Sequence, residues 1–121
     1  MNLFDTTQSA LARALQGTEA RQTVLAANLA NANTPGYQRK DVDFESSLRS
    51  ALGEGRNGDQ RAVDSAALTP ETDTGSPLRA DGSNVDVERE NASIARVGLE
   101  HDALTSIVTA RNAILRAAMG I

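Results

Sequence analysis

The last third of the chain carries the most regular pattern of apolar positions. From residue 86 to about residue 119, apolar side chains recur at alternating steps of three and four, the a/d heptad pattern of a helix that packs along one seam. His101 and Arg111 replace apolar side chains at two seam positions. Asp86 is a good N-cap, and Glu90 adds negative charge in the first turn, where the helix dipole favours it. The apolar seam residues are Ile94, Val97, Leu104, Val108 and Leu115.

A second apolar stripe lies beside this seam. Ile107, Ile114 and Ile121 are spaced by seven residues and therefore share one face of the predicted helix. A long helix obtains most of its stability from packing against other elements. Two stripes therefore predict two partners: the N-terminal helix of the same chain for one, and a neighbouring molecule for the other.

The N-terminal segment predicts a second long helix, from about residue 3 to residue 33. Its stripe is interrupted in the middle by Thr18 and Gln22, and Gly17 adds roughly 1 kcal/mol of helix cost. The segment is therefore expected to be a long helix with a weak middle. Its apolar positions are Phe4, Leu11, Leu15, Leu25, Leu29 and Ala32, of which Leu25 and Leu29 are expected to belong to the helix–helix seam.

The end of this helix is marked by asparagines followed by Thr34-Pro35-Gly36-Tyr37. Proline at the first central position and glycine at the second predict a type II turn, and the proline also keeps the residue before it out of the helical region. The asparagine amides suit helix termination, because they can bond free carbonyls. The Tyr37 ring is expected either to anchor a subunit contact or to pack back on its own helix. The residues assigned to this turn are Asn28, Asn31, Thr34, Pro35, Gly36 and Tyr37.

The middle of the chain, residues 34–85, predicts little regular structure. A short helix is expected over residues 44–52, capped by Asp43 and stopped by Gly53. Residues 53–82 are rich in glycine and proline and are expected to be irregular, with at most a short β element near residues 66–68.

Together these patterns predict a mainly α fold. Two long N- and C-terminal helices form an antiparallel coiled-coil hairpin around a short, largely irregular central segment. The expected division is residues 1–33, residues 34–85 and residues 86–121, with the first and last parts forming one split helical domain.

Composition and charge narrow the function. The chain has 121 residues, a net charge of −4, no cysteine and three aromatic residues, so a deep core, disulfides and thiolate chemistry are not expected. Residues 41–90 carry twelve acidic and five basic side chains, whereas a nucleic-acid-binding protein needs a basic stripe. The single histidine and single lysine belong to no catalytic, metal or phosphate motif. We therefore expect no enzyme, cofactor, nucleic acid or membrane span.

Residues 28–37, Asn-Leu-Ala-Asn-Ala-Asn-Thr-Pro-Gly-Tyr, resemble the N-terminal signature of bacterial flagellar rod and hook proteins. The short length and the continuation over residues 38–44 are similar to the proximal rod proteins of that group. Residues 81–90 are similar to the segment that leads into their C-terminal helix.

The resemblance implies a structural subunit of the flagellar basal-body rod. Such a subunit is exported unfolded, without a cleavable signal, and assembles helically in the periplasm through its terminal helices. The partners implied are itself, other rod subunits, and the adaptor and export-gate components at the rod base. The alternatives are a different axial component or a soluble helical-hairpin adaptor or chaperone.

Overall fold

The computed structural model describes residues 3–53 and 60–121. Within this part the chain is mainly helical, with a two-stranded antiparallel sheet in which Lys40 pairs with Thr72 and Asp41 with Glu71. The elements in order are α1 (Leu3–Ala30), β1 (Lys40–Asp41), α2 (Phe44–Gly53), α3 (Gln60–Asp64), β2 (Glu71–Thr72) and α4 (Val87–Met119).

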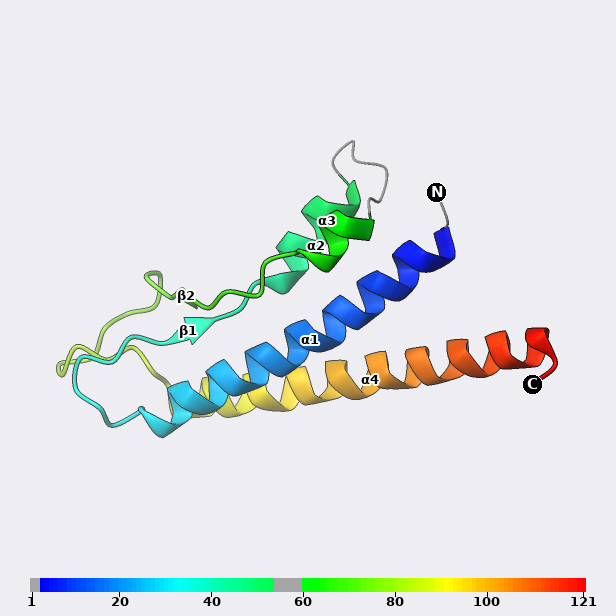
Figure 1. Ribbon diagram of the computed structural model, residues 1–121. Helices are drawn as coiled ribbons and strands as arrows, with labels where there is room; N and C mark the ends of the chain where they lie inside the picture. Colours follow the sequence, from blue (N-terminus) through cyan, green and yellow to red (C-terminus); the bar gives the residue numbers. More distant parts are fainter. Residues whose placement is uncertain (1–2, 54–59) are drawn as a thin grey trace.

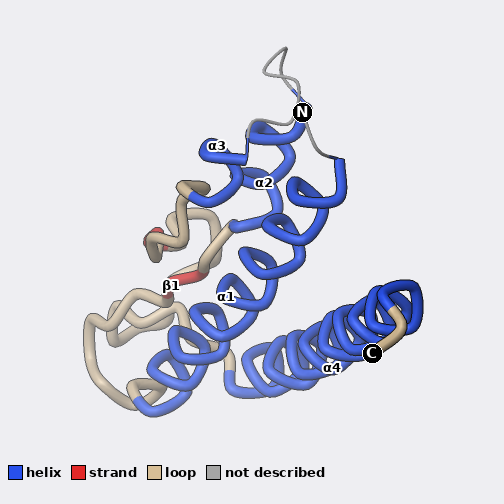
Figure 2. Tube along the Cα trace, turned by 45° about the vertical axis from the view of Figure 1, so that its right-hand side comes forward, coloured by secondary structure: helices blue, strands red, loops and turns tan. Residues whose placement is uncertain are grey.

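The two long helices run antiparallel and pack on each other, so both termini lie at the same end of the molecule (Figure 1). Helices α2 and α3 pack on the N-terminal half of α1, on the side away from α4. Both views show α1 and α4 close together near the turn and diverging toward the termini (Figures 1 and 2). The hairpin is therefore closed at the turn, which we call its base, and open at the termini. The long helix pair was predicted correctly.

Helix α4 begins and ends at local signals. The Asp86 carboxylate accepts hydrogen bonds from the backbone N–H groups of Glu88 at 3.0 Å and Arg89 at 3.3 Å, as an N-cap does. At the other end Gly120 adopts a left-handed conformation with φ of 73°, and the backbone N–H of Ile121 bonds the carbonyl of Arg116 at 3.0 Å. The predicted extent of this helix, residue 86 to about residue 119, is confirmed.

Helix α1 ends three residues earlier than predicted, at Ala30 instead of Asn33. The backbone N–H groups of Ala32 and Thr34 bond the carbonyls of Leu29 at 3.2 Å and Asn31 at 3.0 Å, each three residues back. Hydrogen bonds between residues three apart are those of a 3₁₀ helix, so the end of α1 tightens into 3₁₀ geometry. This is a common way to satisfy the free carbonyls of a helix end.

The middle of the chain is more ordered than predicted in its described part. Helix α2 matches the expected residues 44–52, and its cap is Asp43, whose carboxylate accepts from the Ser46 N–H at 3.2 Å. Helix α3 was not predicted, and the β element lies at residues 71–72 instead of 66–68, where it adds to β1. Residues 54–59 of the segment predicted as irregular lie outside the described residues.

The core of the described part is thin and mostly aliphatic. Phe44 is its one buried aromatic side chain among the described residues, and Leu25, Val42, Val63, Val85 and Val97 are also fully or almost fully buried. Small alanines at the remaining positions let the elements approach closely. Positions that bury little apolar area depend more on hydrogen bonds and ion pairs for their geometry, and these are concentrated at the base of the hairpin.

Candidate functional site

The turn after α1 is built as the Thr34–Tyr37 pattern predicts. Gly36 has φ of 75°, and the Tyr37 N–H bonds the Thr34 carbonyl at 3.2 Å. Because proline fixes φ near −65° at the first central position, this combination is a type II turn. Asn31 lies just before it, donates from its side-chain amide to the Ala27 carbonyl at 2.8 Å and accepts from the Thr34 hydroxyl at 3.1 Å. Thr34, Pro35 and Gly36 are exposed.

The turn lies against a second loop. The Gly36 N–H donates to the Asp81 carbonyl at 2.8 Å, and a Cβ placed on Gly82 would lie 3.4 Å from the Gly36 Cα. Gly82 also has a positive φ of 82°. Two glycines therefore allow the turn after α1 and the segment before α4 to approach closely, which brings the two ends of the hairpin connection together.

Asn28 fixes the chain after the turn. Its side chain is fully buried, and its amide NH₂ donates to the Lys40 carbonyl at 2.7 Å and to the Glu90 carboxylate at 3.3 Å. Its carbonyl oxygen accepts from the Lys40 N–H at 2.9 Å and from the Tyr37 hydroxyl at 3.2 Å. All four hydrogen-bonding positions of the amide are thus used. Tyr37 packs back on its own helix, and Asn28 joins α1, β1 and α4.

A buried ion pair extends this arrangement. Glu90 is 1% exposed and accepts from the Arg39 guanidinium at 2.5 Å, and the same guanidinium donates to Asp73 at 3.0 Å. The Arg39 N–H and the Asp73 carbonyl both bond the Asn84 side chain, at 2.6 Å and 2.9 Å. We call Asn28, Arg39, Asp73, Asn84 and Glu90 the base network. Glu90 is therefore a buried partner of Arg39, whereas the sequence suggested only a favourable charge in the first turn.

The base network holds Asp73 in its ionised form. Hydrogen bonds from Ser76, whose hydroxyl lies 2.7 Å away, and from Arg39 lower the pKa of Asp73 well below its usual range. Hydrogen bonds and positive charge that favour a carboxylate stabilise the fold only while that carboxylate is ionised. The network therefore depends on pH.

Helix α2 is fixed to α1 by an aromatic contact. The Phe44 ring lies directly over Gly17, where an added Cβ would come within 2.4 Å of the ring. The Arg21 guanidinium lies 4.8 Å from the ring centroid, and it also bonds both carboxylate oxygens of Glu45, at 2.5 Å and 2.7 Å. Gly17, which the sequence marked only as a helix cost, provides the space for Phe44.

Along the predicted seam residues, burial decreases from the closed to the open end of the hairpin. Leu25 and Val97 are buried, and Leu29, Ile94, Leu104 and Val108 are half-buried. Leu115 is 39% exposed. It belongs to the C-terminal part of α4, which diverges from α1 (Figure 1). Of the polar interruptions, Thr18 and His101 face each other, with Oγ1 and Nδ1 2.8 Å apart. The Thr18 hydroxyl has one proton and donates it to the Leu15 carbonyl, 2.7 Å away. It can then accept a second hydrogen bond from His101 when the imidazole carries a proton on Nδ1.

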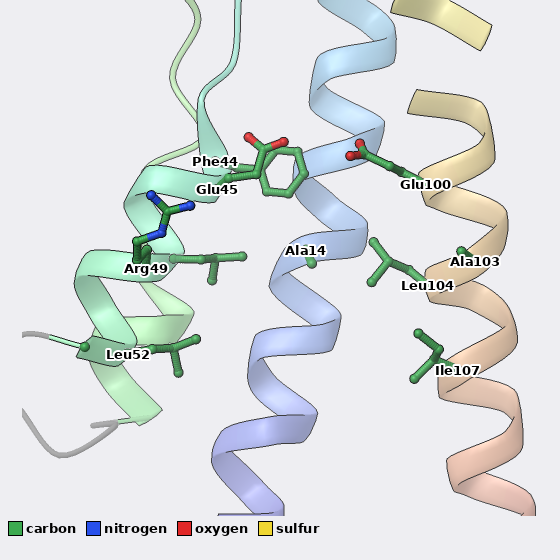
Figure 3. Close-up of a pocket in the computed structure, with 11 residues that line it drawn as sticks. Ala14, Phe44, Glu45, Arg49, Leu52, Glu100, Ala103, Leu104 and Ile107 are labelled. Carbon is green, nitrogen blue, oxygen red and sulfur yellow. The ribbon is translucent and has the colours of Figure 1, made fainter. Parts of the chain in front are cut away.

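The second stripe is exposed. Ile107, Ile114 and Ile121, which we call the tip stripe, are 51%, 69% and 82% exposed. Beside its first residue an open apolar groove of about 660 Å³ runs between α2 and α4, with α1 as its floor (Figure 3). We call it the α2/α4 groove. Its lining residues are Ala14, Phe44, Glu45, Leu48, Arg49, Leu52, Gly53, Glu100, Ala103, Leu104 and Ile107.

The described residues present exposed apolar packing surfaces. Over residues 3–53 and 60–121 no group of histidine, cysteine, aspartate or glutamate side chains is arranged to hold a metal ion. In the same part of the chain no helix is both long and apolar enough to cross a membrane. The tip stripe and the α2/α4 groove are apolar and open to solvent, so both suit contact with another helix.

Comparison with known proteins identifies relatives that are components of an assembly. Residues 4–38 match the family model described as flagella basal body rod protein. The flagellar basal body rod protein FlgB of Escherichia coli K12 is 37% identical over 98 residues, which are 67% of this chain and 69% of the relative. FlgB of Salmonella typhimurium LT2 is 36% identical over 95 residues with the same coverage. FlgB of Bacillus subtilis 168 is 32% identical over 112 residues, 86% of this chain and 85% of the relative.

Proposed function

This chain belongs to the family of flagellar basal body rod proteins, and we propose that it enters the rod through the open end of its helical hairpin. It is a structural subunit of the rod, and its family is structural rather than catalytic. In this proposal residues 1–33 and 86–121 form the assembling unit. Residues 34–85 brace its base.

The exposure of the tip stripe is the observation that carries the proposal. Isolated exposed apolar side chains are normal, but a continuous row on one helix face marks a surface that another element covers. The three isoleucines repeat every seven residues, so a neighbouring helix can pack along the row in coiled-coil fashion. Leu115, exposed by the divergence of the two helices, extends this surface toward the seam.

The two predicted sets of residues take different roles in this proposal. Asn28, Asn31 and the turn at residues 34–37 fix the base, so the signature acts within the chain. The seam residues Leu25, Leu29, Ile94, Val97, Leu104 and Val108 hold α4 on α1, and Leu115 completes the surface offered to a neighbour. Assembly thus uses α4 residues beyond the closed part of the hairpin.

The family membership also supports further parts of the proposal. Other rod subunits and further copies of the chain are the natural partners, and an adaptor and the export gate would contact it at the rod base. Its place would be the periplasmic part of the rod, reached by export without a cleavable signal. In this proposal α1 and α4 would be exported as unfolded chain and would fold as they pack against neighbouring subunits.

The experiment replaces the chromosomal gene in the source bacterium by variants. Ile114→Asp places a charge in the tip stripe and should abolish swimming in soft agar and intact rods in purified basal bodies, because a buried unpaired charge is costly. Thr109→Asp, an exposed position on the far face of α4, is the matched control and should retain both. Complete rods in the Ile114→Asp strain, with normal protein levels, would refute the assembly role of the tip stripe.

A further inference from the structure

We propose that a polar cavity beside the base network binds one small oxyanion group, a carboxylate or a phosphate. The cavity has a volume of about 180 Å³, and its walls come from β1 with the residue before it, from the segment between β2 and α4, and from the start of α4. Three arginines line it, so we call it the arginine pocket: Arg39, Arg89 and Arg96. The inference goes beyond the proposed function and does not depend on the tip stripe or the α2/α4 groove.

Two of these arginines come from one face of α4. Arg89, Ser93 and Arg96 all line the pocket and are spaced by four and three residues, so their side chains leave the helix on the same side. At 1.5 Å per residue the two arginines are roughly 10 Å apart along the helix axis, with the serine between them. Two long side chains at this separation can turn toward an anion that lies near the Ser93 hydroxyl. All three side chains would then donate hydrogen bonds to it.

The carboxylates of the pocket are already bonded within the chain. The Glu90 carboxylate accepts from Arg39 at 2.5 Å, and the Asp41 carboxylate accepts from Arg21 at 3.0 Å. Asp86 accepts from the first backbone N–H groups of α4, so these groups are occupied and the helix dipole offsets its charge. The lining has three arginines and three carboxylates, but each carboxylate has its own partner. Among the described residues that line the pocket, none is therefore left to neutralise the two arginines of α4.

The two arginines of α4 still have hydrogen-bond donors to offer. In the described part of the chain neither guanidinium forms an ion pair or a hydrogen bond, and the Ser93 hydroxyl has no partner there either. Both arginines are exposed, and Ser93 is half-buried. The Arg39 side chain, by contrast, is 17% exposed and is held by Glu90 and Asp73. The pocket thus combines one fixed guanidinium with two that are free to turn toward a ligand.

The donors and the size of the pocket favour a single small oxyanion. A guanidinium presents two parallel N–H groups that match the oxygens of a carboxylate or a phosphate. A cavity of about 180 Å³ has room for about six water molecules at roughly 30 Å³ each. Pockets for drug-sized ligands measure about 300–1,000 Å³, so one oxyanion group fits this cavity better than a nucleotide does. Two sources supply this chemistry: a dissolved phosphate ion, or the carboxylate of an acidic side chain on another rod subunit.

The test uses the full chain, isotope-labelled, and follows its backbone amides and arginine Nε–H groups by NMR. Sodium phosphate is one probe, sodium acetate is the second, and sodium chloride at equal ionic strength is the reference. Arg96→Gln removes one guanidinium of the pocket, and Arg96→Lys keeps the charge but loses the paired N–H groups. Arg116→Gln is the matched control, because it removes an exposed arginine of the same helix outside the pocket. Circular dichroism checks that each variant stays helical.

We expect phosphate and acetate to shift the amide signals of residues 89–96 and the Nε–H signal of Arg96 in a saturable way, whereas chloride leaves them in place. Arg96→Gln should raise the dissociation constant by about tenfold or more, because hydrogen bonds between charged groups are strong. Arg96→Lys should also bind more weakly than the wild type, and Arg116→Gln should bind as the wild type does. Tighter binding of phosphate would identify the dissolved ion as the source, and tighter binding of acetate would identify the acidic side chain.

Three results would overturn the inference: no saturable shift with either anion, shifts confined to residues outside the pocket, or equal weakening by Arg96→Gln and Arg116→Gln. The last result would show a general attraction of anions to positive charge instead of a site. If Arg96→Gln loses helix content, Arg96→Lys carries the test, and binding equal to that of the wild type would then count against the pocket. None of these results bears on the proposed function, which depends on the rods of the Ile114→Asp strain.

Discussion

The contact between Gly17 and Phe44 predicts that Gly17→Ala lowers the free energy of unfolding, whereas helix propensity alone predicts that it raises it. Replacing a glycine inside a helix by alanine usually stabilises the helix by roughly 1 kcal/mol. At Gly17 the added Cβ would lie 2.4 Å from Cγ of the Phe44 ring and 2.7 Å from both Cδ atoms, so ring or helix must move by about 1 Å to restore ordinary contact. We therefore predict that Gly17→Ala destabilises the protein.

The magnitude follows from two limits. If the ring shifts within its site, overpacking costs about 1–3 kcal/mol, and the propensity gain offsets roughly 1 kcal/mol of it. If Phe44 leaves its site, the cost approaches the about 3–5 kcal/mol of a large-to-small aromatic substitution, together with about 0.5–1 kcal/mol for the Arg21 guanidinium over its face. Since the shift is the cheaper response, the expected net loss is the difference of these two terms, about 1 kcal/mol and at most about 2 kcal/mol.

Urea unfolding followed by circular dichroism measures this loss, in the Ile114→Asp background so that association does not contribute. The matched control is Gly98→Ala in α4, where an added Cβ meets nothing within 4 Å. It should raise the unfolding midpoint, while Gly17→Ala should lower it. Phe44→Leu combined with Gly17→Ala should recover part of the loss. A midpoint for Gly17→Ala at or above that of the unaltered chain would show that α2 is not held by this contact.

Two further predictions concern the base network. Asn28→Asp keeps the size of the side chain but removes both donors and faces the Glu90 carboxylate, so it should lower the free energy of unfolding by about 3–5 kcal/mol in urea unfolding, whereas Asn33→Asp, at an exposed position, should leave it unchanged. An unchanged unfolding midpoint for Asn28→Asp would contradict the assigned contacts. Because the folded-state pKa of Asp73 is lowered, its contribution is complete above its ordinary pKa of 3.8 and is lost as the pH falls below that value. Asp73→Asn should therefore lower stability at pH 7 and flatten its loss between about pH 4 and pH 2, and an unchanged acid slope in urea unfolding would contradict this.

Local signals in the sequence were sufficient for the long helices and their ends. Heptad spacing predicted α4, and Asp86 and Asp43 were recognised as caps because a cap depends on side chains within three residues. The turn at residues 34–37 was predicted for the same reason, since proline and glycine act on their own backbone angles. The family resemblance rested on this same segment.

Contacts between distant residues could not be predicted in this way. Arg39 and Glu90 are 51 residues apart, and nothing in either neighbourhood shows that one charge is buried against the other. Gly17 looked like a defect because its partner, Phe44, comes from another helix. The β element was placed a few residues too early because two-residue strands carry almost no periodicity, and β2 exists through its pairing with β1.

The buried amide and ion pairs at one end of the hairpin divide the molecule by resistance to opening. Amide protons near residue 90 can exchange only when the shared bonds of three elements break together, whereas those near residue 114 need only the loss of a single, partly solvated helix turn. Exchange should therefore slow progressively along α4 from the terminus toward the turn. Neighbouring subunits would contact the end of the hairpin that opens more easily, and this end would adapt its conformation to them. The end near the turn resists opening and would keep the same geometry in every copy.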